Sequence, residues 1–433
     1  MWERNPGSEA PGGLESVRYV SESEASYGAG PARSVSGSEG FSLKMKSAST
    51  AFTLALVLLA ARSGPVKATV WRVDVDGSGD APTLQAAIDS AASGDTVLAG
   101  PGHYTWSNQG GDPVRGFICF LDRKHHITFM SEDGPETTIL DAEQGSRAVY
   151  VQGMNHITFE GFSVTGGIAP AFGEYTGGGY FNHISGDTIR NCIFTGNRGR
   201  YGGAIYSCGN GYVTLVEDCT FTGNTAERYG GAAALCCNSV SSVFRRCVIR
   251  GNGAGEGGGG VEHDLCPLTF EECVVAENEC SGRGGAVCGL NDAATIITSC
   301  TIAFNEAPDG AGICIFGSSS LTLRRSILAG NHGLWLSIDE ANAATIGCND
   351  IHGNSGGDDL PAGSIDEGFN IFLDPQFCGV SGSGNYHLQS DSPCLPVNHP
   401  GGLLCQIVGA RPDGCGTTGA GRRSWGGIKL RPH

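Results

Sequence analysis

Basic residues are scarce in this sequence. Its 433 residues include 27 lysines and arginines against 44 aspartates and glutamates, and the formal net charge is −17 at pH 7. A nucleic-acid-binding protein shows a basic stripe, and a protein attracted to anionic lipid shows a basic cluster. The charge balance therefore argues against both classes, and we expect no nucleic-acid partner.

Several other signatures are missing. The 18 cysteines include no paired CxxC motifs with zinc-ligand spacing, and no HExxH sequence occurs. The 70 glycines follow no three-residue period, which excludes collagen. What is present is a chain rich in glycine and cysteine, and such a cysteine content suits an oxidising compartment.

The N-terminal region predicts secretion. Lysines flank Met45, an apolar run follows at 51–61, and small residues for signal peptidase lie around Ala68. The run is too short for a transmembrane helix, which needs about 20 apolar residues. We therefore interpret 1–44 as disordered or untranslated and 45–68 as a signal peptide. The mature chain is expected to begin at Thr69 and to contain no transmembrane segment.

The central chain is a tandem repeat. Each unit contains a short apolar segment ending in asparagine, and these asparagines lie at 197, 224, 252, 278, 305 and 331. A glycine-rich element starts at 202, 230, 258, 284 and 310. A third apolar position keeps the same period: Ile189, Val216, Phe244, Phe270, Ile297 and Leu323. Each unit thus carries three short β-rich runs separated by Gly or Asn turns.

One such unit cannot bury its apolar face alone, but stacked units can. Coils one strand spacing apart, about 4.8 Å, place like residues on like residues and make a continuous core. The asparagines then form a side-chain ladder at a turn that tolerates left-handed backbone, and glycine permits positive φ at the second turn. Helical repeats of similar length fail because 3.6-residue periodicity is missing. The sequence predicts an all-β parallel β-helix with three strands per coil over 69–372.

The motifs of one unit resemble a known family. Phe194 to Asn197, followed by Gly202 to Ile205, resembles the FxxN and GGAI elements of the repeat in chlamydial polymorphic outer-membrane proteins. Later units replace the phenylalanine with Ile, Val or Leu. The resemblance covers roughly 165–355 and implies the right-handed, pectate-lyase-like β-helix of secreted bacterial proteins.

The first coil needs a cover, because an open β-helix end exposes its core. Thr83 is expected to cap a short N-terminal helix whose Leu84, Ile88 and Ala91 share one face. The segment 96–105 is then expected to form the first strand and turn. The whole block 73–105 resembles the opening of pectinesterases, in its capping part and not in its catalytic part.

The other end is expected to carry a disulfide-bonded cap at 373–415, followed by a flexible tail at 416–433. Its segments LDPQFC and YHLQSDSPC resemble the closing part of secreted bacterial β-helix proteins. We expect disulfides that join Cys378 with Cys394 and Cys405 with Cys415, although a sequence alone does not fix connectivity.

The other cysteines follow the repeat. Cys208 shares its position in the repeat with Cys236, and Cys288 shares its position with Cys314. These two pairs are therefore second-rank disulfide candidates. Another set shares an inward register and is expected to form a buried stack of thiols: Cys192, Cys219, Cys247, Cys273 and Cys300. Metal binding by this stack is not expected, because ligands along a ladder are not tetrahedrally disposed.

Two columns of charge precede the cysteine stack. One reads Arg190, Glu217, Arg245, Glu271, Thr298 and Arg324, and the other reads Asn191, Asp218, Arg246, Glu272, Ser299 and Arg325. We interpret them as ion pairs between neighbouring coils that disfavour slipped registers, not as an active site. Each exposed pair contributes only about 0–1 kcal/mol.

Enzymes of this fold act on polysaccharides, but the catalytic motifs of pectinesterases, polygalacturonases and pectate lyases are absent here. The resemblance therefore transfers no catalytic residue. The residues before each glycine-rich element are expected to line one long surface, where arginine and tyrosine could stack on sugar rings and pair with carboxylates. The ligand-binding candidates are Arg200, Tyr201, Arg228, Tyr229 and Arg283. Weak catalytic candidates are Arg228, Glu256, Glu262, His263 and Asp309.

A solvated turn edge is the alternative interpretation of that surface. Four acidic residues, Asp358, Asp359, Asp366 and Glu367, supply oxygen ligands that could bind Ca²⁺, and no other cofactor is expected. The sequence favours a secreted or surface-attached β-helix that binds polysaccharide or a cell-surface glycan, as an adhesin does. Two alternatives stay open: a lyase or glycoside hydrolase acting on acidic polysaccharide, and a structural envelope component.

Overall fold

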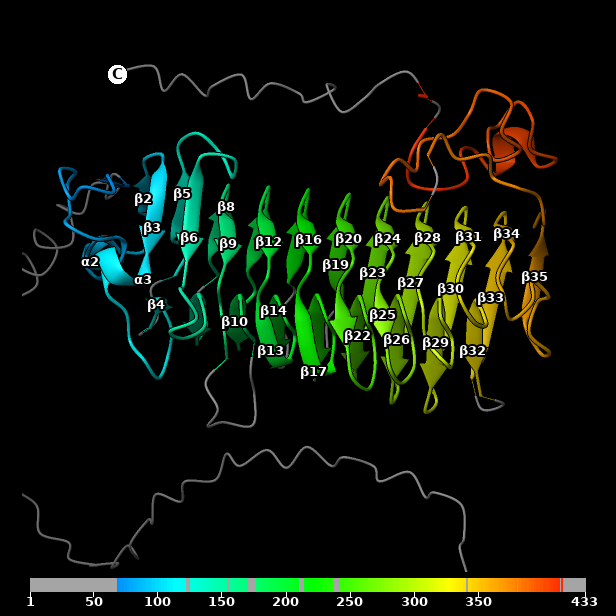
Figure 1. Ribbon diagram of the computed structural model, residues 1–433, viewed down its shortest axis with the longest axis horizontal. Helices are drawn as coiled ribbons and strands as arrows, with labels where there is room; N and C mark the ends of the chain where they lie inside the picture. Colours follow the sequence, from blue (N-terminus) through cyan, green and yellow to red (C-terminus); the bar gives the residue numbers. More distant parts are fainter. Residues whose placement is uncertain are drawn as a thin grey trace, which may run out of the picture. The chain divides into compact units, whose positions relative to one another are not determined.

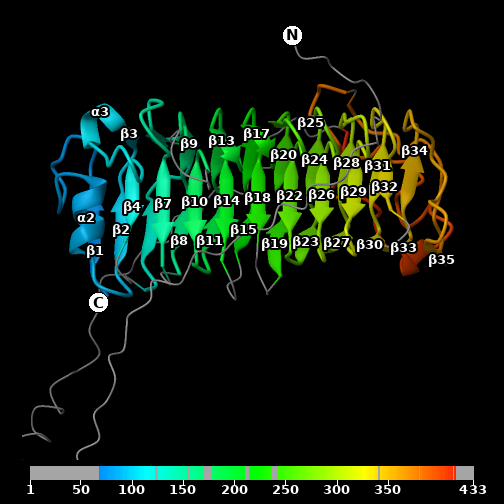
Figure 2. The same ribbon diagram turned by 90° about the horizontal axis from the view of Figure 1, so that it is seen from below.

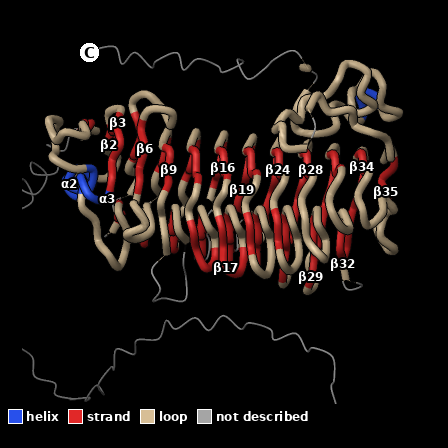
Figure 3. The backbone as a smooth tube through the Cα atoms, viewed as in Figure 1, coloured by secondary structure: helices blue, strands red, loops and turns tan. Residues whose placement is uncertain are grey.

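The computed structural model describes residues 68–121, 125–153, 156–169, 177–209, 214–236, 241–339, 342–379, 381–412 and 414–415. They form a parallel β-helix whose coils stack along one axis (Figure 1). Strands recur at the same places in successive coils, with turns between them (Figure 3). The predicted fold class is confirmed. No helix in the described part is long and apolar enough to span a membrane. The predictions for 1–44, for the signal peptide up to residue 67 and for the tail at 416–433 lie outside these residues.

Three sheets run along the stack of described coils and a fourth, short sheet spans part of it; each pairs its strands in parallel and in chain order. Sheet 1 contains β1 (Val70–Val73), β2 (Thr96–Ala99), β5 (Thr128–Ser131), β8 (Thr158–Glu160), β11 (Thr188–Arg190), β15 (Leu215–Glu217), β19 (Ser242–Arg245), β23 (Leu268–Glu271), β27 (Ala294–Thr298), β30 (Ser320–Arg324), β33 (Ala343–Gly347) and β35 (Ile365–Gly368). Sheet 2 contains β3 (Gly102–Thr105), β6 (Thr138–Asp141), β9 (Ser163–Thr165), β12 (Ile193–Thr195), β16 (Thr220–Thr222), β20 (Val248–Arg250), β24 (Val274–Ala276), β28 (Thr301–Ala303), β31 (Ile327–Ala329) and β34 (Asp350–His352).

The other two sheets close each coil. Sheet 3 contains β4 (Ile118–Phe120), β7 (Val149–Gln152), β10 (Tyr180–His183), β14 (Ile205–Cys208), β18 (Ala233–Cys236), β22 (Val261–Asp264), β26 (Val287–Leu290), β29 (Ile313–Phe316) and β32 (Leu336–Ile338). A short sheet 4, which the sequence did not predict, lies between sheets 2 and 3 and contains β13 (Arg198–Tyr201), β17 (Thr225–Tyr229), β21 (Gly253–Ala254) and β25 (Glu279–Cys280). The helical elements are α2 (Leu84–Ser90), α3 (Trp106–Gln109) and the 3-10 turn η1 (Gly402–Leu404).

An asparagine ladder runs through the core at the end of sheet 2, as predicted. The side-chain oxygen of each member accepts from the backbone N–H of the preceding member at 3.0–3.1 Å and from its Nδ2 at 2.8–3.0 Å. The ladder ends at Asn354, whose backbone N–H and Nδ2 donate to Asp358. These bonds satisfy buried polar groups that no strand partner reaches.

The prediction that these asparagines adopt left-handed backbone is wrong. In several coils positive φ occurs one residue before the asparagine, at Gly196, Gly223, Gly251 and Gly330. Positive φ also occurs at a separate place, the corner between sheets 1 and 2. That corner holds one residue with φ of 51–55° in each of six coils: Asn191, Asp218, Arg246, Glu272, Ser299 and Arg325. Because the preceding residue makes the bend, each asparagine can direct its amide along the stack.

The N-terminal cover follows the prediction. Thr83 Oγ1 accepts from the backbone N–H of Ala86 at 3.1 Å, and Leu84, Ile88 and Ala91 are buried. Helix α2 lies at the N-terminal end of the stack (Figure 1). The first strand, however, is β1, and the segment expected to be first splits into β2 and β3 around a turn.

The segment 373–415 covers a side of the β-helix and not its last coil. It lies beside strands β24 to β34 (Figure 1), where Tyr386 Oη donates to Glu277 at 2.7 Å and Arg250 donates to the Gly382 carbonyl at 2.7 Å. The outward residues of sheet 2 become apolar in these coils, and Val274 and Ala303 pack against Tyr386. At the end of the stack, by contrast, Ile365 and Phe369 are 60% and 47% exposed.

The disulfides of this segment differ from the predicted pairs. Cys378 bonds to Cys415, and Cys348 bonds to Cys405. Cys394 is a buried thiol that donates to Asp350 at 3.0 Å. The predicted pairs are wrong because the segment folds back on the stack, which brings residues distant in sequence together. The pair Cys288–Cys314 is confirmed.

Candidate functional site

Three aromatic rings stack on the outer face of sheet 3. Tyr150, Phe181 and Tyr206 occupy equivalent positions on β7, β10 and β14. The first two ring centroids are 5.1 Å apart with an interplanar angle of 3°, and the next two are 5.6 Å apart at 13°. Side chains alternate across a strand, so these rings point outward while Val149 and Ile205 enter the core.

Sheet 4 extends this aromatic face. Tyr201 of β13 and Tyr229 of β17 pair in register and stack with their ring centroids 5.8 Å apart. Tyr201 also lies 6.4 Å from Tyr206, which joins the two sets of rings. Five rings therefore stack over four successive coils, on the side where the strands β7, β10, β14 and β18 lie next to one another (Figure 2). Tyr150, Tyr201 and Tyr229 are partly exposed, whereas Phe181 and Tyr206 are buried.

Arginine side chains lie on the same face. The guanidinium of Arg147 is 4.6 Å from the Phe181 centroid, that of Arg200 is 5.6 Å from Tyr201, and that of Arg228 is 5.1 Å from Tyr229. We call this set the aromatic–arginine surface. Its members are Arg147, Tyr150, Phe181, Arg200, Tyr201, Tyr206, Arg228 and Tyr229.

Arg228 is held from two sides. It donates to Tyr201 Oη at 2.8 Å and to both carboxylate oxygens of Glu256 at 2.6 and 2.8 Å. The Arg228 guanidinium holds the pKa of Glu256 below its usual range. Burial and a hydrogen bond to Glu256 raise the pKa of Tyr229. These contacts fix the planes of the arginine and both tyrosines before any ligand arrives.

The predicted ligand-binding residues lie on one side of successive coils, and their role stays a prediction. Tyr229, Gly257, Arg283 and Asp309 are bridged in turn on successive coils. Arg283 lies over the Phe316 ring at 4.7 Å, farther along the same side. The sequence did not indicate Arg147, Tyr150, Phe181 or Tyr206. The available signal was an aromatic residue at the second position of three strands in sheet 3.

The position of His263 does not fit the catalytic role considered for it. Its ring is fully buried inside the coil, where Nδ1 lies 2.9 Å from the Cys266 carbonyl and Nε2 lies 2.9 Å from Thr295 Oγ1. Burial lowers the pKa of His263 to about 4. The prediction failed because period-2 alternation sends His263 inward and the adjacent Glu262 to the outer face, where Glu262 is still 95% buried (5% exposed).

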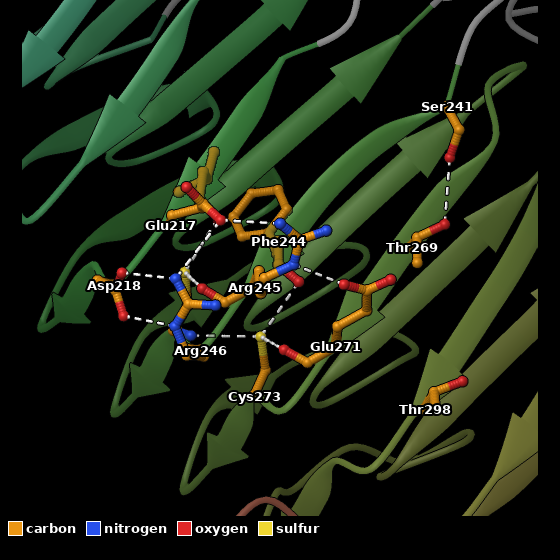
Figure 4. Close-up of polar contacts among 12 residues, drawn as sticks. Glu217, Asp218, Ser241, Phe244, Arg245, Arg246, Thr269, Glu271, Cys273 and Thr298 are labelled. Carbon is orange, nitrogen blue, oxygen red and sulfur yellow. Dashed lines mark hydrogen bonds and ion pairs between the residues drawn. The ribbon is translucent and has the colours of Figure 1, made fainter.

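The charged columns form a ladder, as predicted (Figure 4). Arg245 bridges Glu217 at 2.9 Å and Glu271 at 2.6 Å, and Arg246 pairs with Asp218 at 2.7 Å. Acids and bases alternate from coil to coil and neutralise one another. The geometry of these pairs explains the register of the coils.

Three of the four acidic residues considered for Ca²⁺ have protein partners, and the backbone carbonyl of the fourth, Asp359, accepts from Trp335 Nε1 at 3.1 Å. Asp358 ends the asparagine ladder, Asp366 accepts from Asn370 at 2.7 Å, and Glu367 pairs with Arg324 at 2.6 Å. Among the described residues, no group of three histidine, cysteine or acidic side chains is arranged to hold a metal ion.

The predicted cysteine stack is buried in the core. Cys192, Cys219, Cys247, Cys273 and Cys300 are at most 1% exposed and are thiols. Burial raises the pKa of Cys219, Cys247 and Cys300, so these groups are packing residues and not nucleophiles. On sheet 3, Cys208 and Cys236 lie in register as predicted but are not joined by a disulfide.

Comparison with known proteins agrees with this architecture. The Chlamydia polymorphic membrane protein repeat matches residues 191–208 and 218–236. Pectate lyase Pel9A superimposes with a TM-score of 0.52 and 15% sequence identity, over 80% of this chain and 96% of that chain. This protein is a pectate-lyase-like β-helix with polymorphic-membrane-protein-like repeats. The two matched repeats contain Tyr201, Tyr206 and Tyr229.

Two other comparisons add no argument about function. A pectin methylesterase from carrot aligns with a TM-score of 0.37 and 13% identity, over 72% of this chain and 89% of that chain. No curated protein sequence matches the chain. The β-helix itself therefore indicates a scaffold, and any activity must be argued from its side chains.

Proposed function

We propose that this β-helix acts outside the cell or at its surface and binds a glycan chain along the aromatic–arginine surface. The stack of five rings, of which Tyr150, Tyr201 and Tyr229 are partly exposed, is the observation that carries the proposal. Sugar rings present apolar C–H faces that pack on aromatic side chains, while their hydroxyls accept hydrogen bonds from arginine. The predicted signal peptide and the repeats support the location.

The spacing of the surface suits an extended ligand. Neighbouring coils are about 4.8 Å apart, and ring centroids on adjacent coils are 5.1–5.8 Å apart. A linear polymer lying along the stack would contact the partly exposed rings of Tyr150, Tyr201 and Tyr229, whereas Phe181 and Tyr206 are buried beneath the surface and support them. Because the rings are held by the sheets and by Arg228, little side-chain entropy is lost on binding.

The enzymatic alternative has less support. Its candidate base, His263, lies in the core, and Arg228 and Glu256 are tied to each other. General acid–base catalysis needs groups that reach a substrate proton. We therefore propose binding without turnover.

The test is a glycan array, followed by calorimetry with any glycan that binds. We expect Tyr229→Ala to weaken binding about ten-fold, because removing one stacked ring costs on the order of 1.4 kcal/mol. Arg246→Ala, at the corner between sheets 1 and 2, is the matched control and should bind normally. Unchanged binding by Tyr229→Ala, or no glycan bound by the wild-type protein, would contradict the proposal.

A further inference from the structure

The last coil of the β-helix exposes a strand edge beside apolar side chains. Strand β35 ends sheet 1 at the opposite end of the stack from α2 (Figure 1), and no strand of the described part pairs with its outer edge. The turn 355–364 lies toward sheet 3, where the Asp359 carbonyl accepts from Trp335 Nε1 at 3.1 Å. The apolar side chains of the last coil are 47–60% exposed, and they are Ile365, Phe369, Phe372 and Leu373.

The environment of Phe372 shows that the core is left open here. Ile371 is bridged to Asp350, so Phe372 follows in register with Ile351. Ile351 is fully buried in the inward column of sheet 2, whereas Phe372 is 48% exposed. A free strand edge beside exposed apolar side chains is a template on which another extended segment can add as a strand. We call the outer edge of β35 together with Ile365, Phe369, Phe372 and Leu373 the open end.

The charge of this region favours a basic partner segment. No lysine or arginine occurs between Arg325 and Arg411, whereas the same stretch contains nine aspartates and glutamates. A second copy of the chain would bring two acidic ends together. Antiparallel pairing of β35 with its own copy would place Asp366 and Glu367 opposite one another, and like charges directly opposite are destabilising.

The C-terminal residues 421–433, which lie outside the described residues, have the complementary composition. They contain no acidic residue and four basic ones: Arg422, Arg423, Lys429 and Arg431. From Ile428 to Arg431 apolar and basic side chains alternate, which is the period of a strand with one apolar face. Ile428 and Leu430 share that face, and Lys429 and Arg431 share the other.

The chain is long enough to bring this segment to the open end. Cys378 is five residues beyond Leu373, and Cys415 is disulfide-bonded to Cys378 with a Cα–Cα distance of 5.1 Å. Since five residues span at most about 18 Å, Cys415 lies within roughly 23 Å of Leu373. The thirteen residues from Cys415 to Ile428 span up to about 43 Å when extended.

We propose that residues 425–431 add to the outer edge of β35 as a final strand and cover the open end. Ile428 and Leu430 pack over Phe369 and Phe372, and the basic side chains lie among the acidic residues of the last coils. Residues 416–424 remain the flexible linker that the sequence predicts. The β-helix is then closed at one end by α2 and at the other by its own C-terminal segment, independently of any glycan binding.

Hydrogen exchange, read by mass spectrometry, tests this docking by comparing the full chain with a chain that ends at Ala420. We expect residues 365–373 to exchange at least ten-fold more slowly in the full chain. Strand β22, in the middle of the stack, should exchange equally in both chains, which verifies that the shortened chain is folded. Ile428→Asp should remove the protection as the deletion does. Thr418→Asp, in the linker, is the matched control and should keep it.

The full chain should show the same protection over a hundred-fold dilution, because the docking is intramolecular. Equal exchange of residues 365–373 in the full and shortened chains would overturn the proposal, as would protection retained in Ile428→Asp. Protection that falls on dilution, together with a dimer detected by light scattering, would also overturn it and assign the open end to a second copy of the chain.

Discussion

The asparagine ladder should be the part of the core least tolerant of substitution. Asn252 accepts from the Asn224 backbone N–H and Nδ2, both at 3.0 Å, and donates to the Phe221 carbonyl at 3.1 Å and to Asn278 Oδ1 at 3.0 Å. Asn252→Ala removes all four bonds. Two of the partners keep another bond, because Asn224 Nδ2 still donates to Phe194 and Asn278 Oδ1 still accepts from the backbone of residue 252.

The cost follows from the groups that lose their partner. The Asn224 N–H loses its acceptor, and the Phe221 carbonyl loses a donor, at positions that water does not reach. Each buried unsatisfied group costs about 1–3 kcal/mol, so we expect Asn252→Ala to destabilise its coils by about 2–5 kcal/mol.

Hydrogen exchange measures this effect coil by coil, which suits a solenoid whose coils need not unfold together. The Asn224 amide and its neighbours should lose protection. The control is Asp358→Ala at the ladder's end, where water can replace the carboxylate and the cost should be about 1 kcal/mol. The reasoning fails if both substitutions cost the same, or if Asn252→Ala costs less than about 1 kcal/mol.

Three other predictions follow. Burial raises the pKa of Asp350 to about 6, above its unfolded value of about 3.9, so ionisation should remove up to about 3 kcal/mol of stability as pH rises from about 4 to 6. Asp350→Asn should abolish this loss, which denaturation at several pH values measures. The pH effect of His263 has the opposite sign. Its folded pKa of about 4 lies below the unfolded value of about 6.5, so up to about 3 kcal/mol of stability should be lost as the pH falls from about 6.5 to about 4. Because Asp350 acts in the opposite direction over the same pH range, the His263 effect is measured in Asp350→Asn, where stability should fall as the pH falls. A flat acid limb in Asp350→Asn, or a loss that remains when His263→Gln is added to it, would contradict this. Arg245→Ala should lower the free energy of unfolding, measured by urea denaturation, by about 1 kcal/mol or less, because its two ion pairs are partly exposed. A larger loss would contradict this and would mean that the charged ladder contributes substantially to stability.

The internal core could be predicted from the sequence because the repeat maps one coil onto the next. A period of 26–28 residues puts Cys219 beside Cys247 and Asn224 beside Asn252, whatever the details of each turn. The same logic predicted the ion pairs of Arg245 and the disulfide between Cys288 and Cys314. It misplaced the left-handed residues, which lie at two separate bends: Gly196, one residue before the ladder, and Asn191, at the corner between sheets 1 and 2.

The contacts on the outer faces could be predicted less well, because they join residues that occupy different positions in the repeat unit. Arg147 meets Phe181 across two coils, and Tyr201 meets Tyr206 across two sheets. Neither contact has a fixed spacing in the sequence.

The sequence by itself thus determined the coil, its period, the inward columns and the helical cover at Thr83. All of these follow from translating one short unit along an axis, with side chains alternating in and out. Only the tertiary structure decided that 373–415 folds back along sheet 2, that Cys378 meets Cys415, and that Arg147 is buried against two aromatic rings. Those outcomes depend on lateral packing of irregular segments against particular side chains, which no period encodes.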